Sequence, residues 1–536
     1  MNPTRNLHTA TLVLASLAAV GSARLEASAA AAADAPTYSS HVATILNQHC
    51  VSCHRPGQIA PMSLRSYDEV RPWVKSIAQR VADGTMPPWH ATGGTAKFVN
   101  DRSLEQAAID TLVSWAQSGA PAGDLATAPP PPQYPDGEWQ LGEPDFVVTL
   151  DPVELPAGGP DQFPKIVGKV ALPDDKWITA VEILPGNAKV VHHVIAVAVK
   201  GFDVDPVDGW VGAWAAGTEP MVFPEGTGRF LEKGSNIIAD MHYHPADTPQ
   251  SDVTRIGLHF ADGKIEKELT NLWVVNESFE IPPGATDYEL RAQHRFWQNG
   301  KIFAFAPHMH YRGKDFRYVA HWPDGTQETL LEVARWDFNW QTWYRLAEPI
   351  QVPEGTVLEA IAHYDNSADN PANPDPTQAV RFGNETKDEM MIGFVDFVAD
   401  DGVRPMTPHE ARTRELQRLA AAQPDMVFAV SAKPVEKRSE PHSFAPLVLE
   451  TGASEGVFYV IWGRQLEPSR IHDLRWDGTA FAGKVDSPRG SFDVTGTLEG
   501  RKASATLHLP QGRLVTFDGE LAGSHPVAAS PSAGGR

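Results

Sequence analysis

The sequence predicts a multidomain chain: an all-α domain, then two all-β sandwich domains, then a small C-terminal β module. Helical spacing predicts the first part, because the apolar residues from Ser103 to Gln117 recur at the period of a helix and Gly119 follows as a stop. Short runs of β-forming residues between Gly, Pro and Asp-Gly turns predict the sandwiches. A length of 536 residues suits about three or four domains that each bury a core.

Composition excludes several classes of protein. The chain has 45 Lys and Arg against 67 Asp and Glu, a formal charge of −22. This acidic balance argues against nucleic-acid binding, which needs clustered basic residues. With 42% hydrophobic and 21% charged residues, the chain is globular, not disordered. The 2 cysteines exclude a disulfide framework unless they pair with each other.

Residues 1–23 have the pattern of a secretory signal peptide. Arg5 supplies the positive charge, Thr11–Val20 is the apolar core, and small residues follow. An uncleaved anchor is the alternative. The apolar core is too short for an ordinary membrane-spanning helix, and no later segment reaches about 18 apolar residues. We therefore expect a periplasmic or secreted protein without a transmembrane segment.

The remaining boundaries follow from changes in composition along the chain. Low-complexity residues mark a tether, prolines mark a linker, and a capping box with Pro408 predicts a helix over Thr407–Ala421. The expected parts are the tether at 24–37, the all-α domain at 38–123, the Pro-rich linker at 124–144, the two sandwiches at 145–275 and 276–432, and the small β module at 433–536.

A C-x-x-C-H motif runs from Cys50 through Cys53 to His54. Two thiols one helical turn apart can form thioethers to the two vinyl groups of a haem, and the adjacent His then ligates the iron. A redox dithiol and a structural disulfide are the competing interpretations. A thioredoxin-type dithiol expects a βαβ context, whereas this segment is predicted to be helical.

The second axial ligand must come from further along the chain. Met86, in a Pro-rich loop after a helix, is the best candidate, and Met62 and His90 are alternatives. With these residues, the segment 38–123 resembles the small cytochrome c domains. The resemblance implies an all-helical electron-transfer module with a covalently bound haem c.

Histidines gather at three places in the β region. They are His192-His193, His242-x-His244 and His308-x-His310, and Met390 follows later. Residues i and i+2 of a strand point to the same face, so His308 and His310 can reach one ion. The rings of His192 and His193 would point to opposite faces of a regular strand, and both can bind one metal only where the strand is bulged or ends.

The ligand types restrict the metal. Imidazole suits copper, zinc and iron, and a thioether favours Cu(I). A non-haem iron site with a facial triad needs a carboxylate beside two histidines, and none lies within these clusters. A catalytic zinc site with three histidines stays open as an alternative.

The order of these residues resembles the copper type II, ascorbate-dependent monooxygenases, which include the peptidylglycine and dopamine hydroxylating enzymes. The shared order is a double His, Met-His-Tyr at 241–243, His-Met-His followed by Gly313, and Asp-Glu-Met at 388–390. The resemblance covers about residues 145–400. It implies two jelly-roll-like sandwiches with one copper on each, facing an open solvent cleft.

Carried over residue by residue, the resemblance assigns both copper ions. One would be held by His192, His193 and His242, and would store an electron. The other would be held by His308, His310 and Met390, where O2 binds and the substrate C–H bond is hydroxylated.

Three positions depart from the family pattern. His244 is an extra imidazole that can compete as a ligand. Ala306 stands where the peptide-processing members have a carboxylate-binding Arg, and Phe394 stands where they have a Tyr. Both changes argue against a peptide substrate with a C-terminal glycine.

The sequence therefore predicts an exported haem- and copper-dependent monooxygenase acting on a small-molecule substrate. Its electrons would come from ascorbate or another external redox donor, delivered through the haem on the same chain. A non-catalytic electron-transfer or copper-handling protein is the alternative, and a zinc hydrolase is the third interpretation.

Overall fold

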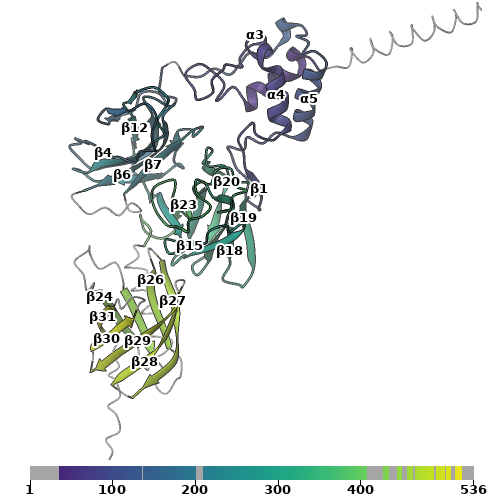
Figure 1. The fold of residues 1–536 in the computed structure, drawn as a ribbon. Coiled ribbons are helices and arrows are strands. Elements are labelled where there is room, and N and C mark those ends of the chain that lie inside the picture. Colours follow the sequence, from purple (N-terminus) through teal and green to yellow (C-terminus); the bar gives the residue numbers. More distant parts are fainter. Residues whose placement is uncertain are drawn as a thin grey trace, which may run out of the picture. The chain divides into compact units, whose positions relative to one another are not determined.

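The chain forms two compact units. The computed structural model describes residues 36–135, 137–200 and 209–406, and then the strands between 427 and 521 with a few adjoining residues. The predicted signal peptide at 1–23 and the predicted helix Thr407–Ala421 lie outside the described residues. One unit comprises residues up to 89 together with 101–142, and the other comprises 90–100 together with the chain from 143 onward. In Figure 1 the purple helices belong to the first unit and the teal to yellow strands to the second.

Short helices pack around a small apolar core in the first unit. They are η1 (Tyr38–Val42), α2 (Ala43–His49), α3 (Tyr67–Val70), η2 (Arg71–Trp73), α4 (Val74–Ala82), α5 (Gln106–Gln117) and η3 (Leu125–Thr127). Trp115 of α5 is fully buried, and its indole donates a hydrogen bond to the Pro121 carbonyl. Gly119 follows α5 with a φ of 88°, the left-handed conformation in which glycine commonly ends a helix. None of the helices in the described ranges has the length and apolar character needed to cross a membrane.

The prediction of an all-α cytochrome c-like domain at the N-terminal end is wrong. Sheets make up most of the regular structure in the described residues, and the α-helices are only 4 to 12 residues long. The segment 90–100, inside the predicted domain, belongs to the second unit, where β1 (Ala91–Gly93) pairs with β19 (Gln327–Val333). The regular apolar spacing of residues 103–117 corresponds to a single helix, α5. Elsewhere in the segment prolines limit the length of the helices, among them Pro56, Pro61, Pro87 and Pro88 in the stretches between helices.

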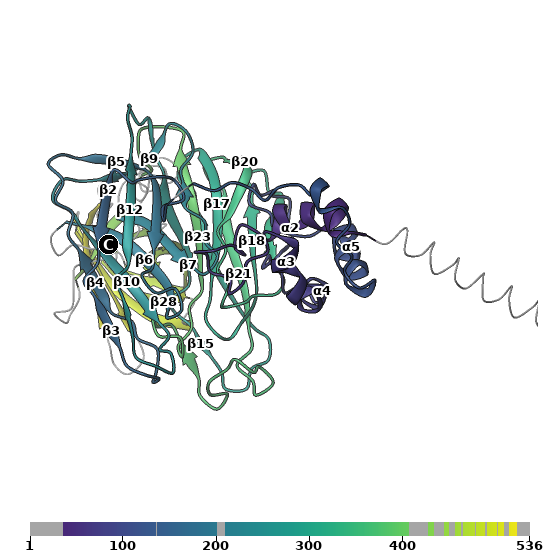
Figure 2. The same cartoon turned by 90° about the horizontal axis from the view of Figure 1, so that it is seen from above.

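Two facing sheets form the first β-sandwich. One has the strand order β13-β9-β5-β12-β2 with β8 beside β5, and the other has the order β4-β10-β6-β7 (Figure 2). Their fully buried side chains include Ile178, Val194 and Ile237. The strands are β2 (Phe146–Thr149), β4 (Lys165–Gly168), β5 (Lys176–Leu184), β6 (Val191–Val199), β7 (Trp210–Ala215), β8 (Met221–Val222), β9 (Thr227–Leu231), β10 (Asn236–Tyr243), β12 (Arg255–Phe260) and β13 (Lys267–Glu268), with the separate pair β3 (Val153–Leu155) and β11 (Gln250–Asp252).

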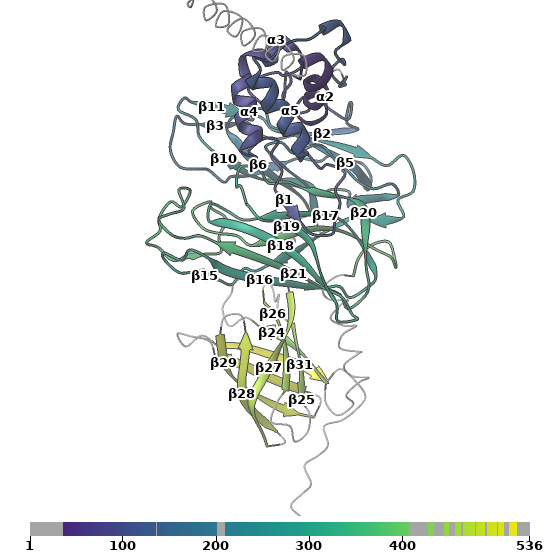
Figure 3. The ribbon, with the colours of Figure 1, turned by 90° about the vertical axis from the view of Figure 1, so that its right-hand side faces the viewer.

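The second β-sandwich has the same two-layer plan. One sheet has the order β1-β19-β18-β21-β16, of which β18, β19 and β21 lie side by side in Figure 3, and the other has the order β14-β23-β17-β20. The rings of Tyr318 on β18 and Phe305 on β17 pack at 4.7 Å between the layers. The strands are β14 (Thr270–Val275), β16 (Tyr288–Arg295), β17 (Gly300–His308), β18 (Gly313–His321), β20 (Tyr344–Val352), β21 (Val357–Tyr364) and β23 (Ile392–Ala399), with the separate pair β15 (Glu280–Ile281) and β22 (Val380–Arg381).

The last strands of the chain form a closed antiparallel sheet. Each strand pairs with the next, and β24 also pairs with β31. The strands are β24 (Val427–Lys433), β25 (Phe444–Leu449), β26 (Gly456–Trp462), β27 (Gln465–Trp476), β28 (Ala480–Ser487), β29 (Gly490–Glu499), β30 (Lys502–His508) and β31 (Leu514–Leu521).

A buried ion pair joins the two sandwiches. Arg229 on β9 donates to Asp396 on β23 at 2.8 Å, and the two side chains are only 3% and 9% exposed. Asn271 on β14 donates to the same carboxylate oxygen at 2.9 Å. Burial raises the pKa of Asp396 and lowers that of Arg229, so each charge depends on the other for its stability.

We expect Asp396→Asn to destabilise the joined sandwiches by about 3–5 kcal/mol, because it leaves the buried Arg229 without its counter-charge. Asp240→Asn is the matched control, since Asp240 pairs with Lys165 in a pair whose side chains are 38% and 62% exposed. It should cost at most about 1 kcal/mol. Differential scanning calorimetry of the full chain measures both, and equal shifts of the two variants would contradict a special role for the buried pair.

Candidate metal centre

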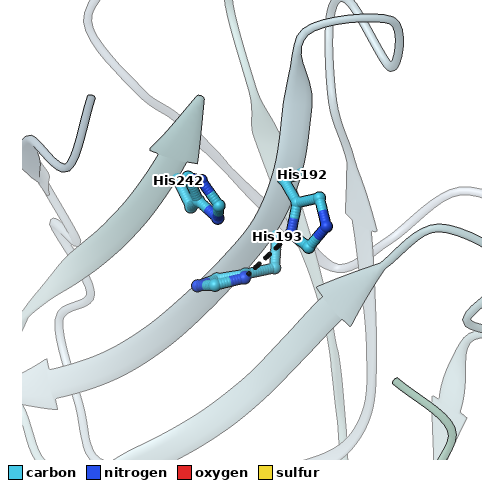
Figure 4. A group of neighbouring side chains, drawn as sticks. All are labelled: His192, His193 and His242. Atoms are coloured by element: carbon cyan, nitrogen blue, oxygen red, sulfur yellow. Dashed lines mark hydrogen bonds between the residues drawn. The ribbon is translucent and has the colours of Figure 1, made fainter. Parts of the chain in front are cut away.

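Three imidazoles converge from two neighbouring strands of the first sandwich. His193 on β6 lies directly opposite His242 on β10. The next residue of β10, Tyr243, pairs with Val191, so His192 is the extra residue of a β-bulge. A bulge turns a side chain away from strict alternation, and here both adjacent rings face His242 (Figure 4). The sequence predicts that His192 and His193 can bind one ion only where the strand is bulged or ends, and the bulge is present here.

The spacing of these rings suits a single metal ion. His192, His193 and His242 each offer a ring nitrogen, and the three nitrogens lie within 4.8 Å of one another. The Nδ1 atoms of His192 and His193 are 3.3 Å apart. For metal–nitrogen bonds of about 2.0–2.1 Å, two ligands of a tetrahedral ion lie about 3.3–3.4 Å apart. The donor set therefore fits a metal that prefers imidazole, copper and zinc among them.

Asp161 orients the third ring. His242 donates from Nε2 to Asp161 Oδ2 at 2.8 Å, and the buried Nδ1 of His242 has no hydrogen-bond partner among the described residues. A carboxylate that holds one ring nitrogen and leaves the other to the metal is a common arrangement in metalloproteins. Burial opposes ionisation of Asp161, but the hydrogen bonds from His242 and His244 lower its pKa to about 2.

His244 takes a different position from the other three. Its side chain is 68% exposed, and its Nδ1 lies 2.8 Å from Asp161 Oδ1. It therefore shares the orienting carboxylate with His242 and lies outside the group of converging nitrogens.

Aromatic rings enclose the three-histidine group. Phe338 stacks on His192 with ring centroids 4.4 Å apart, and Phe163 stacks on His242 at 4.6 Å. Burial lowers the pKa of His192 to about 3 and that of His193 well below its usual value, with the neighbouring His242 adding to both effects. These two rings are therefore neutral near pH 7, the form in which an imidazole ligates a metal.

A second pair of imidazoles lies at the end of β17 in the second sandwich. His308 is the last residue of β17 and His310 follows two residues later, with ring centroids 5.3 Å apart. His308 Nδ1 is 2.8 Å from Gln341 Oε1, and His310 Nδ1 is 3.2 Å from the Asp388 carbonyl. Since both acceptors require a proton on Nδ1, the Nε2 atoms of both rings keep their lone pairs for a ligand.

Burial also keeps this pair neutral. It lowers the pKa of His308 to about 4 and that of His310 well below its usual value. Both side chains are buried, with residue exposures of 6% and 2%. Both rings are thus in the neutral form in which an imidazole ligates a metal.

A buried carboxylate ties this pair to Met390. Glu389 is fully buried, and its Oε2 accepts hydrogen bonds from the backbone N–H of His310 at 2.8 Å and of Met390 at 3.1 Å. Its other oxygen accepts from the N–H of Arg312 at 2.7 Å. The carboxylate therefore fixes the backbone of two proposed ligands from segments that are remote in sequence. Met390 itself is half-buried and packs against an apolar cluster with Ala306.

The two histidine sets meet. The ring centroids of His193 and His308 are 6.1 Å apart and nearly perpendicular. Phe338, from the second sandwich, contacts His192 and also lies 6.3 Å from His310. The family resemblance implies an open solvent cleft between the two sets, whereas in this structure their rings are neighbours.

The C-x-x-C-H motif lies where α2 ends. The His54 N–H donates to the Cys50 carbonyl, which places both thiols within one helical turn, and both cysteines are unpaired. His54 Nδ1 lies 3.3 Å from the Met62 carbonyl, which leaves Nε2 for an iron. Burial raises the pKa of Cys50 to about 12. These residues fit a covalently attached haem.

The alternatives for the second axial ligand fall in different places. Met86 is half-buried in the first unit, at a cis peptide bond with Pro87. Met62 packs against the helical core of the same unit. His90 belongs to the second unit, where it is buried and where Asp337 and Arg335 act on its pKa, which burial lowers.

Sequence reasoning did not find the residues that hold these rings in place. Asp161 lies in a Gly- and Pro-rich loop without a motif, and Gln341 and Phe338 lie in another loop. Glu389 stands inside the Asp-Glu-Met triplet at 388–390, in which the family resemblance assigns a ligand role to Met390 alone. The only signal that pointed to it is its position directly before Met390.

Comparisons with known proteins do not place the chain in a family. No family model matches it, and no curated protein matches its sequence. Among solved structures, the VP2 subviral particle of infectious bursal disease virus aligns over 52% of this chain and 87% of that one, with 9% identity and a TM-score of 0.14. The Gx strain structure of the same virus aligns over 56% of this chain and 93% of that one, with 11% identity and a TM-score of 0.13. Scores this low carry no argument about fold or function.

We expect Asp161→Asn to weaken metal binding at the three-histidine group by about 10–100-fold, because the amide no longer fixes the His242 ring in one tautomer. His244→Ala is the matched control, since it removes the exposed partner of the same carboxylate. Competition titration with a copper chelator measures both variants. Loss of the metal from His244→Ala, with binding intact in Asp161→Asn, would show that the ligand from this segment is His244.

Proposed function

We propose that this chain is a copper-dependent monooxygenase that hydroxylates a C–H bond of a small molecule with O2. The balanced reaction is R–H + O2 + 2 electrons + 2 protons giving R–OH + H2O, with the electrons from ascorbate or another one-electron reductant. The observation that carries the proposal is the meeting of two separate histidine sets, one of which shares a buried carboxylate with a methionine.

Copper would supply oxygen activation at one set and storage of an electron at the other, since an imidazole pair with a thioether favours Cu(I) and an all-imidazole site accepts either oxidation state. His192, His193 and His242 would hold one ion. His308, His310 and Met390 would hold the other.

The surrounding residues support this division of roles. Asp161 and Gln341 hold one nitrogen of their histidines, and Glu389 fixes the backbone at His310 and Met390. Phe338 and Phe163 stack on the imidazoles and exclude water from one side of them. A dry, pre-organised shell of this kind strengthens every electrostatic interaction inside it.

The second proposed group is a haem bound through Cys50, Cys53 and His54, which would supply one-electron transfer to the same chain. The support is the pair of free thiols one helical turn apart and the contact of His54 Nδ1 with the Met62 carbonyl.

Part of the predicted linker packs beside this motif. Asn47 donates to the Pro130 carbonyl at 3.0 Å, and the Arg55 guanidinium lies 3.7 Å from the centre of the Tyr134 ring.

Two other functions make different predictions. A non-catalytic electron-transfer or copper-handling protein would bind the same metals without substrate-dependent oxygen uptake. A zinc hydrolase would fit the three-histidine group by itself, because that donor set suits zinc as well as copper. Met390 favours copper, since Glu389 binds its backbone N–H together with that of His310 and a thioether is a soft ligand.

Met390→Ala tests the proposed reaction. We expect it to abolish product formation and substrate-dependent oxygen uptake while copper stays at the three-histidine group, because only the other site loses a ligand. Met391→Leu is the matched control, since Met391 is the neighbouring buried methionine. Oxygen electrode traces and copper analysis of the purified full chain give the two readouts. Equal loss of both coppers in Met390→Ala would contradict the assignment, and absence of copper-dependent uptake in the unmodified chain with every reductant would contradict the function.

The haem assignment has its own test. Expressed with c-type haem maturation, the chain should carry one covalently bound haem that survives acid–acetone extraction, detected by mass spectrometry and by the pyridine haemochrome spectrum. Cys53→Ser should leave at most one thioether, which shifts the haemochrome band, whereas Ser52→Ala should leave it unchanged. Absence of covalent haem from the matured chain would contradict the haem assignment. It would have no bearing on the proposed copper sites.

A further inference from the structure

A small cavity adjoins both histidine sets at the junction of the sandwiches. Its volume is about 40 Å³, and its walls include one ring from each set, His193 and His308. A water needs roughly 10–15 Å³ of such space, so the cavity holds about three waters, or a group the size of a small ketone. The rest of the wall comes mainly from apolar and aromatic side chains of both sandwiches, among them Trp210, Ala306, Trp343 and Phe394.

Aromatic rings give the cavity a rigid wall. Trp210 lies 5.2 Å from Phe394 and 6.0 Å from Trp343, and Trp343 stacks on Phe394 at 6.1 Å, all between ring centroids. Ala306, which pairs with Phe394 across β17 and β23, keeps the floor open because it has only a methyl group. Rigid aromatic walls favour an apolar ligand of defined shape.

The wall contains no Asp, Glu, Lys or Arg side chain. An ammonium group placed in this cavity would therefore lose its water without gaining a counter-charge, which is costly.

One hydrogen-bond donor in the wall is unused. Trp210 is 4% exposed, and its indole Nε1 is buried without a hydrogen-bond partner among the described residues. Buried indole N–H groups usually have a partner, so an unpaired one beside a cavity indicates a ligand that supplies an acceptor.

We infer that this cavity binds a mainly apolar substrate that has no cationic group and carries one hydrogen-bond acceptor oxygen, such as a ketone, ether or alcohol, with Trp210 as the residue that recognises the oxygen. This inference rests on the proposed function for the identity of the site as the place of reaction. The inference adds the class of substrate, which follows from the absence of charged side chains in the wall of the cavity. Ala306 determines the size of the group that enters.

Two probes of similar size and different charge test the inference on the full, copper-loaded and reduced chain kept free of oxygen. They are butanone and butylammonium, and their binding is followed by saturation-transfer NMR and titration. We expect butanone to bind and butylammonium to give no saturable binding. Butylammonium binding as tightly as butanone would overturn the inference without any variant.

Two variants place the binding in the cavity. Trp210→Phe keeps an aromatic ring but removes the donor, so it should weaken butanone binding by about tenfold, the value of one hydrogen bond at the upper end of its usual range. Trp273→Phe is the matched control, because Trp273 belongs to the same aromatic cluster but does not line the cavity. Ala306→Leu should fill the floor and abolish binding. If both control and test variants retain copper and Trp210→Phe binds butanone as the unmodified chain does, the role of Trp210 is excluded.

Oxygen uptake separates this inference from the function on which it rests. Selective binding of butanone without oxygen uptake for any neutral substrate would support the inferred binding site and contradict the proposed monooxygenase function. Oxygen uptake driven by a cationic substrate, without binding of butanone, would support the monooxygenase function and contradict the inferred substrate class.

Discussion

One extra residue in β6 determines the geometry on which the candidate centre depends. Because Tyr243 pairs with Val191 while His242 pairs with His193, His192 has no counterpart on β10, and the strand is bulged there. Without the bulge, the side-chain period of a strand would send the rings of His192 and His193 to opposite faces, one toward the apolar core and the other away from it. The convergence of three imidazoles thus depends on strand register, and loops add Asp161, Phe163 and Phe338, which hold the rings in place.

The junction of the sandwiches then decides what the two histidine sets can do together. Arg229 and Asp396 pair where burial disfavours both charges, so the pair is stable only when the two sandwiches are in register. Around it, the aromatic cluster of Trp210, Trp273 and Phe394 fills the junction with rigid side chains. The contact between His193 and His308 follows from this packing, since each ring projects from a different sandwich.

Much of the second unit could be predicted from the sequence. Alternating apolar runs and turns identify the β-rich character of the chain, and the clustering of histidines identifies the residues that come together, including the need for a bulge at His192. The orienting residues could not be predicted. Asp161 and Gln341 act through loops whose paths depend on tertiary packing, and Glu389 acts on backbone N–H groups, which leave no pattern in the side-chain sequence. The all-α prediction fails for a related reason. The amphipathic pattern of α5 is local, whereas the rest of the predicted domain contains prolines and a segment, 90–100, that joins a sheet.

That segment has a consequence for the way the chain is divided. Because 90–100 belongs to the β-rich unit while 101–142 returns to the helical one, the polypeptide passes between the units three times. The helical unit is therefore interleaved with the sandwich, and the two are not consecutive modules separated by one spacer. A chain cut just before Glu143 would lack β1, and β19 would become an outer strand with unpaired backbone groups along one edge. Truncation at the apparent linker would thus leave an exposed sheet edge that can pair with other chains and cause aggregation.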